Sequence, residues 1–180
     1  PRARKKLAAV LKDPDPKVRE AALLVISELR RSAKGMIRDV AALLKDPDPG
    51  VRRQAARSLG KLNWVAKKDG TGPLIAATTD KDPKVRELAV KALSQTGRGK
   101  VAVEDAVIKA LKDPVVEVRI AATRSMQSFV ALDHAEAVPA LIAVLLDHLV
   151  QVRVDDLRYA LVAGQDVLQV PDLRKEGGVL

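Results

Sequence analysis

The segment LKDPDPKVREAA, residues 11–22, decides the fold of this 180-residue chain, because close copies of it follow four more times. The copies read LKDPDPGVRRQAA (44–56), TTDKDPKVRELA (78–89), LKDPVVEVRIAA (111–122) and LLDHLVQVRVDD (145–156). A Val-Arg pair fixes their register, and its valines follow one another at intervals of 33, 34, 33 and 34 residues. A fixed period of this length is the signature of a repeat architecture.

Each copy predicts two helices joined by a tight turn. Apolar residues recur seven and eleven positions before each Val and eight positions after it, with Thr78 as the one exception, and this is the spacing of one helix face. Asp-Pro steps between the stripes interrupt the helical pattern. We expect left-handed caps at Gly35, Gly97 and Gly164. The predicted helix pairs are 2–12 and 16–33, 36–45 and 49–62, 73–79 and 83–95, 101–112 and 116–130, and 135–146 and 149–163.

One such hairpin cannot bury its apolar stripe alone, so neighbouring hairpins must stack into an all-α solenoid. Aromatic residues make up only 2% of the chain, and paired alanines recur in the second helices, which favours closely packed helices. We expect a single repeat domain over residues 1–164, followed by an irregular tail at 165–180. The five repeats are predicted at about 1–34, 35–66, 67–98, 99–132 and 133–164.

The pattern Leu-x-Asp-x-x-x-x-Val-Arg-x-x-Ala resembles HEAT repeats, specifically the short type named after phycobilisome lyases. The stretch AVPALIAVLLD, residues 137–147, is similar to the first helix of that family. The resemblance spans roughly residues 2–164 and implies a right-handed superhelix of five helix-turn-helix units whose second helices line the concave face. Scaffolds, adaptors, chromophore lyases and DNA glycosylases share such repeats, so the resemblance predicts fold better than function.

Turn aspartates and Val-Arg arginines form two series with the same period. The resemblance implies that they build an inter-repeat ladder that holds the stack together, and a turn aspartate can also cap the next helix. The predicted ladder residues are Asp13, Arg19, Asp46, Arg52, Asp80, Arg86, Asp113, Arg119, Asp147 and Arg153.

A second position, six residues after each Val, is charged in four of the five copies and lies opposite the apolar stripe. On the concave face that the resemblance implies, it would form a basic binding stripe, flanked by Gln54, Gln95 and Gln127. The alternative is an ordinary solvated helix face. The predicted basic stripe consists of Arg53, Arg57, Lys91, Arg124 and Arg158.

Positive charge is concentrated in the first two repeats. Residues 1–70 carry 18 Lys and Arg against 8 Asp and Glu, whereas residues 71–180 carry 14 against 15. Phosphate contacts from such a region would give salt-sensitive nucleic-acid binding. Base stacking needs aromatic side chains, and only Trp64 is near, for which we expect a packing role.

No catalytic constellation is visible in the sequence. The two histidines, His134 and His148, have no nucleophile or ligand set beside them, and there is no cysteine. Asp155 and Asp156 are adjacent in a predicted helix and point in different directions. We therefore expect no enzyme, no cofactor and no metal site, because the residues of a lyase or glycosylase pocket cannot be mapped here.

The leading hypothesis is a non-enzymatic protein-interaction scaffold whose partner presents an acidic surface to the concave stripe. The alternative is nucleic-acid binding through the basic N-terminal repeats. We expect a cytoplasmic protein that does not enter a membrane, and either end-to-end association or membership of a larger chain.

Overall fold

The computed structural model describes residues 2–66, 69–96 and 100–126, all within one compact unit, residues 1–144. This part contains helices and no strand. The first helices of the hairpins are α1 (Arg2–Val10), α3 (Ile37–Ala42), α5 (Thr71–Ala77) and α7 (Val101–Ala110). The second helices are α2 (Pro16–Glu28), α4 (Pro49–Leu62), α6 (Pro83–Thr96) and α8 (Val116–Met126). Short 3-10 helices are η1 (Arg30–Met36), η2 (Leu43–Lys45) and η3 (Asn63–Ala66).

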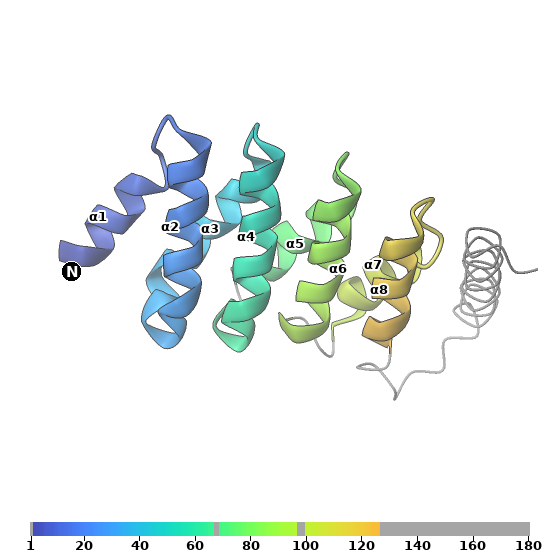
Figure 1. Cartoon of the computed structure of the whole chain (residues 1–180). Helices are drawn as coiled ribbons and strands as arrows, with labels where there is room; N and C mark the ends of the chain where they lie inside the picture. Colours follow the sequence, from blue (N-terminus) through green and yellow to red (C-terminus); the bar gives the residue numbers. More distant parts are fainter. Residues whose placement is uncertain (1, 67–68, 97–99, 127–180) are drawn as a thin grey trace, which may run out of the picture. The chain divides into compact units, whose positions relative to one another are not determined.

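The second helices stand side by side in one row, α2, α4, α6 and α8, with α3, α5 and α7 behind them (Figure 1). Each second helix contacts the next, and α3 contacts α5, which contacts α7. The described residues therefore form an all-α solenoid of stacked hairpins, as the period of the sequence predicts. Four of the five predicted hairpins lie in this part, and the fifth, at 133–164, lies outside the described residues.

Aspartate and proline start the second helices at the predicted places. Asp15 has an extended backbone and its carboxylate accepts a hydrogen bond from the Lys17 backbone N at 2.8 Å, with Pro16 in the first turn. Asp48 accepts from the Val51 N at 3.1 Å in the same way. Such side-chain caps satisfy donors that the first turn of a helix leaves without a partner.

The predicted end of the first hairpin is wrong. Helix α2 ends at Glu28 and not near residue 33, because the chain reverses at Arg30, whose φ is 45°. Gly35 is not a left-handed cap but lies inside η1, where a Cβ would collide with the guanidinium of Arg4. The reversal lets η1 return to the core and bury Ala33 and Met36. The other two predicted caps, Gly97 and Gly164, lie outside the described residues.

Several first helices differ from their predicted bounds. The helix predicted at 36–45 divides into α3 and η2, α1 and α7 each end two residues early, and α5 begins at Thr71. In repeat three, Thr78 replaces the leucine of the other copies. Its hydroxyl donates to the Ile75 carbonyl at 2.7 Å, so this polar substitution is satisfied locally.

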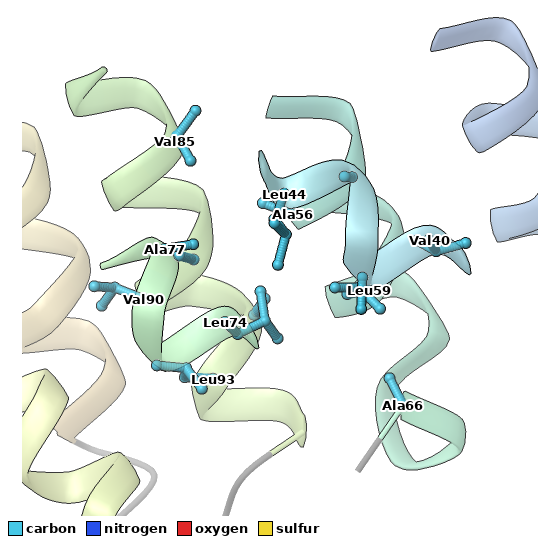
Figure 2. Packing of buried hydrophobic residues seen from close by; sticks show 14 of the residues in the cluster. Val40, Leu44, Ala56, Leu59, Ala66, Leu74, Ala77, Val85, Val90 and Leu93 are labelled. Atoms are coloured by element: carbon cyan, nitrogen blue, oxygen red, sulfur yellow. The ribbon is translucent and has the colours of Figure 1, made fainter. Parts of the chain in front are cut away.

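The core is a continuous layer between the two rows of helices. Leu74 from a first helix and Leu59 from a second helix are fully buried in it, together with the register valine Val85 (Figure 2). The register valine Val51 is also fully buried. Small residues bring the second helices together. A Cβ built on Gly60 of α4 would lie only 3.1 Å from the Cβ of Ala92 on α6. Close helix approach therefore explains why this core needs few aromatic residues.

Candidate functional site

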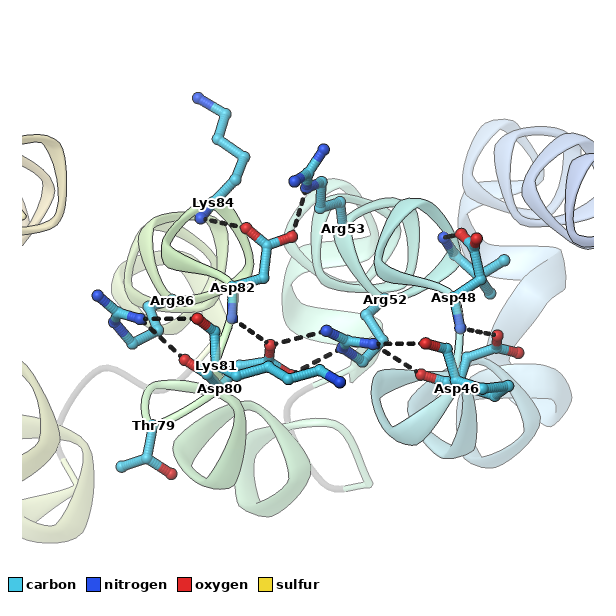
Figure 3. A network of polar contacts seen from close by, with 12 residues as sticks. Asp46, Asp48, Arg52, Arg53, Thr79, Asp80, Lys81, Asp82, Lys84 and Arg86 are labelled. Carbon is cyan, nitrogen blue, oxygen red and sulfur yellow. Dashed lines mark hydrogen bonds and ion pairs between the residues drawn. The ribbon is translucent and has the colours of Figure 1, made fainter.

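Three arginines of the Val-Arg series each form an ion pair with the turn aspartate of the next repeat. Arg52 donates from Nε and Nη2 to the two carboxylate oxygens of Asp80, at 2.9 and 3.0 Å (Figure 3). Its Nη1 donates to the Asp46 carbonyl of its own turn at 2.9 Å. Two parallel charge-assisted hydrogen bonds combine strength with fixed geometry. We call the three pairs the inter-repeat ladder: Arg19–Asp46, Arg52–Asp80 and Arg86–Asp113.

The ladder aspartates also close their own turns. The Oδ1 of Asp46 accepts a hydrogen bond from the backbone N of Asp48 at 3.0 Å. In the same way, Asp80 accepts from the backbone N of Asp82, and Asp113 accepts from the backbone N of Val115. Among the described residues, these three aspartates therefore close the turn and do not cap the following helix. The second aspartate of the turn does so, which the sequence reasoning missed although the spacing of Asp15 and Asp48 was visible.

Ladder contacts shift the pKa of Arg19 and the pKa values of both members of the Arg86–Asp113 pair. Hydrogen bonding to Asp46 raises the pKa of Arg19 above its ordinary value, against the opposing effect of burial. Burial of the Asp113 carboxylate opposes its ionisation, but hydrogen bonds from Arg86 and the Val115 backbone N outweigh it and hold the pKa of Asp113 below 3.8. Arg86 and Asp113 therefore both stay charged at neutral pH.

Asp13, the first aspartate of the predicted ladder, differs from the inner aspartates. The carboxylate of Asp13 accepts the Asp15 backbone N at 2.9 Å, and among the described residues no arginine donates to it. Arg119 donates to the Asp113 carbonyl at 2.8 Å, as the other arginines do within their own turns. Asp147 and Arg153 lie outside the described residues.

The predicted basic stripe falls on the exposed sides of three neighbouring helices. Arg57 of α4, Lys91 of α6 and Arg124 of α8 are all exposed. The side chain of Arg53 is 46% exposed and Nε donates to Asp82 at 2.6 Å. Arg158 and the flanking Gln127 lie outside the described residues.

Two of these cations already have internal carboxylate partners. Asp82 partners Arg53, and Glu87, which is buried, bonds both Lys84 at 2.6 Å and Lys91 at 2.5 Å. Burial works against the charged form of Glu87, yet the two lysines lower its pKa below 4.5. Sequence reasoning missed Glu87, although its spacing of three and four residues from the lysines is the helical spacing for ion pairs.

Arg57 is the stripe cation whose recorded contact is with a neutral group, a 3.5 Å hydrogen bond to the Gln54 side chain. It lines a groove of about 300 Å³ that is formed by α2, α4 and α6. Gly60 and Ala92 contribute small residues to the groove, and Leu24, which is 52% exposed, lies on its border. The remaining lining residues are Ser27, Gln54, Ala56, Lys61, Leu88, Lys91 and Gln95.

Two features are absent from the described part of the chain. No group of three or more His, Cys, Asp or Glu side chains there could hold a metal ion. Neither do the helices placed there include one long and apolar enough to cross a membrane. His134, His148, Asp155 and Asp156 lie outside the described residues.

Comparisons with known proteins agree with the repeat architecture. A family model described as HEAT repeats matches residues 3–70 and 71–162. An engineered protein, solved as a structural genomics target, superposes with a TM-score of 0.59 and 25% identity over 77% of this chain and 66% of the other. This chain thus spans slightly less than two thirds of that protein's length. A designed armadillo repeat protein in complex with the peptide (KR)4 gives a TM-score of 0.58 at 20% identity, over 77% of this chain and 68% of that one. No curated protein matches the chain.

Proposed function

Because this chain belongs to the HEAT-repeat family, whose solenoids generally mediate protein–protein interaction, we propose that it is a non-enzymatic scaffold with a partner bound along α4, α6 and α8. A row of stacked helices offers an extended, pre-ordered surface, so a partner loses little free energy to ordering the scaffold. The phycobilisome-lyase type of HEAT repeat stays a prediction.

The observation that carries the proposal is the groove formed by α2, α4 and α6 and its border. Arg57 lacks a carboxylate partner among the described residues, and the exposed Leu24 offers an apolar contact beside it. The amides of Gln54 and Gln95 line the same groove and can bond a peptide backbone. This combination suits an acidic segment that carries apolar residues at intervals.

The geometry of the row suggests the register of such a segment. Packed helices lie about 8–10 Å apart, and an extended chain advances about 3.3 Å per residue. Roughly three peptide residues therefore match one repeat. The designed armadillo repeat protein holds a basic peptide, (KR)4, and the exposed cations here favour a peptide of opposite charge.

Nucleic-acid binding is the second candidate, favoured by the excess of 18 basic over 8 acidic residues in positions 1–70. Internal pairing lowers the charge available for phosphate contacts, because Arg19, Arg52, Arg53 and Arg38 all have carboxylate partners. This is the reason for placing protein binding first.

Fluorescence anisotropy with a labelled (LEE)4 peptide, its (LKK)4 counterpart and duplex DNA tests both candidates. We expect (LEE)4 to bind, (LKK)4 not to bind, and the Arg57→Glu/Arg124→Glu variant to bind (LEE)4 at least about tenfold more weakly. Lys109→Glu/Lys112→Glu, which reverses two exposed cations on α7 and in the turn after it, is the matched control and should bind as the wild type does. Circular dichroism checks that both variants fold.

Failure of (LEE)4 to bind, or equal binding by both double variants, overturns the proposed stripe. Duplex DNA binding that falls by orders of magnitude between about 50 and 200 mM salt promotes the nucleic-acid candidate instead.

A further inference from the structure

A second groove lies between the first helices α3 and α5, which stand in the other row of helices from α4, α6 and α8 (Figure 1). It consists of two adjoining cavities of about 480 and 530 Å³. The cavities are continuous, because both are lined by Ala41, Lys45, Pro73 and Ala76. We call this space the α3–α5 groove. Most of its other apolar lining residues are also small, among them Ala42, Gly72 and Ala77.

The repeat period explains why the groove is open at this joint. Ala41 lies ten positions before the register Val, and the next two repeats have Ile75 and Ile108 at the same position. Ile75 is half-buried and packs against the core. Alanine therefore leaves a space between α3 and α5 that an isoleucine side chain would occupy. Gly72 keeps the α5 side open as well, since a Cβ there would meet nothing within 4 Å.

Most polar groups along the groove already have internal partners. Arg52 bonds Asp80 at one end, and Arg38 bonds Asp69 at 3.1 Å at the other. The last three carbonyls of α5 accept hydrogen bonds from the turn that follows it. An extended peptide in this groove would therefore leave much of its backbone without partners, which is costly. An alkyl chain carries no polar group and has no such cost.

The ammonium groups of Lys45 and Lys81 are the exception. Both side chains are exposed, and neither ammonium group has a recorded hydrogen bond or ion pair within the described residues. Lys81 lies beside the Arg52–Asp80 pair at the turn end of the groove (Figure 3). The groove thus combines two cations at one end with an apolar floor, and this combination suits an anionic head group that carries an apolar chain.

We propose that the α3–α5 groove binds a long-chain carboxylate. Its head group lies between the ammonium groups of Lys45 and Lys81, which donate charge-assisted hydrogen bonds to the two oxygens. Its alkyl chain lies over Ala41 and Ala76, where it is removed from water. The groove shares no lining residue with the groove beside Arg57, so this site and the peptide surface proposed above can each fail without the other.

Isothermal titration calorimetry of the full chain with dodecanoate, 1-dodecanol and dodecylamine, each below its micelle-forming concentration, tests the proposal. We expect dodecanoate to bind at one site and the amine not to bind, because the head group must complement two cations. The alcohol should bind at least about tenfold more weakly than dodecanoate. Decanoate, which lacks two CH₂ groups, should also bind about tenfold more weakly.

Two variants test the two parts of the site separately. Ala76→Leu fills the groove from an exposed position of α5, and Lys45→Gln/Lys81→Gln removes both charges. Each should weaken dodecanoate binding at least about tenfold. The matched controls change exposed residues that line none of the grooves described: Ala102→Leu on α7 and Lys12→Gln/Lys34→Gln. Both controls should bind as the wild type does, and circular dichroism checks that every variant folds.

Arg57→Glu/Arg124→Glu, the variant of the peptide surface, should bind dodecanoate as the wild type does. Absence of dodecanoate binding, or equal binding by the groove variants and their controls, would overturn the proposal. Loss of dodecanoate binding in Arg57→Glu/Arg124→Glu would place the ligand on the peptide surface and would also overturn it. Displacement of dodecanoate by (LEE)4 from that same variant would assign the α3–α5 groove to an acidic peptide instead.

Discussion

Arg52 and Arg53 are consecutive residues of α4, yet they belong to two different surfaces. The Arg52 side chain is 5% exposed and bonds three oxygen-bearing groups in its own turn and the next. The Arg53 side chain is 46% exposed and makes one ion pair with Asp82. One residue of helical rotation separates a buried structural contact from a surface contact, because successive side chains point about 100° apart around an α-helix.

The comparison teaches that residue type alone does not distinguish the two surfaces. The joint between repeats uses buried charge at the turn end and small side chains along the helices, whereas the exposed side uses charge that solvent screens. A buried pair that loses one partner leaves the other charge without compensation. An exposed pair contributes little to stability. Mutations should therefore separate the surfaces sharply.

Removing a ladder arginine should have the largest effect. Arg52→Ala leaves the largely buried Asp80 carboxylate without its bidentate partner, and we expect a loss of about 3–5 kcal/mol in the free energy of unfolding. Arg57→Ala is the control on the same helix, because Arg57 is exposed and contacts the neutral Gln54 side chain, and it should cost less than about 1 kcal/mol. Urea denaturation followed by circular dichroism measures both values. Equal losses in the two variants would contradict the division between the surfaces.

Filling the contact between small residues should have an intermediate effect. Gly60→Leu forces a side chain against Ala92 on the neighbouring helix, and we expect a loss of about 1–3 kcal/mol from overpacking. Gly72→Leu is a glycine control, because a Cβ at Gly72 meets nothing within 4 Å. If Gly60→Leu proves as stable as this control, the second helices are not closely packed at that point.

Lowering the pH should have the smallest effect on the free energy of unfolding. The pKa of Asp113 lies below 3.8 and that of Glu87 below 4.5 in the folded protein, despite burial, because of their cationic partners. The unfolded chain therefore takes up protons first as the pH falls. This part of the stability is complete above about pH 5 and is lost progressively as the pH falls through the folded pKa values.

Urea midpoints measured between about pH 3 and 7 check the acid prediction. Asp113→Asn should be less stable than the wild type at pH 7, and the difference should narrow in acid. A difference that widens as the pH falls would reverse the sign of the inferred pKa shift.

The sequence predicts the repeat, the hairpins and the starts of the second helices, because these depend on local patterns: the period, the Pro positions and the apolar spacing. It fails at the end of α2, where Arg30 adopts a conformation that glycine would usually take. That reversal is set by the burial of Ala33 and Met36 in the core, which local propensity does not reveal.

The candidate site could be predicted only in part. Because equivalent positions of successive repeats occupy equivalent places on successive helices, the period predicts that Arg57, Lys91 and Arg124 lie on the exposed sides of neighbouring helices. The neutralisation of Arg53 by Asp82 joins two repeats, and it depends on side-chain geometry across the joint rather than on position within one repeat. The structure was therefore needed to identify the cations that have no internal carboxylate partner and remain available to bind another molecule.

Because each ladder arginine bonds both its own turn and the next one, the ladder should limit how the repeats move. Each guanidinium ties the backbone carbonyls of its own turn to the carboxylate of the next, so successive turns form an edge of nearly fixed length. Among the described residues, the opposite ends of the second helices have no such bidentate tie, and Lys61 and Glu28 meet there as an exposed ion pair. We expect neighbouring repeats to rotate relative to one another about the edge formed by the ladder turns, with the larger displacement at the far ends of the helices. Distances between spin labels placed on neighbouring turns should then vary less than distances between labels placed at the far ends of neighbouring helices. Such a rotation would widen and narrow the groove formed by α2, α4 and α6, so that the protein could accept partners of different width.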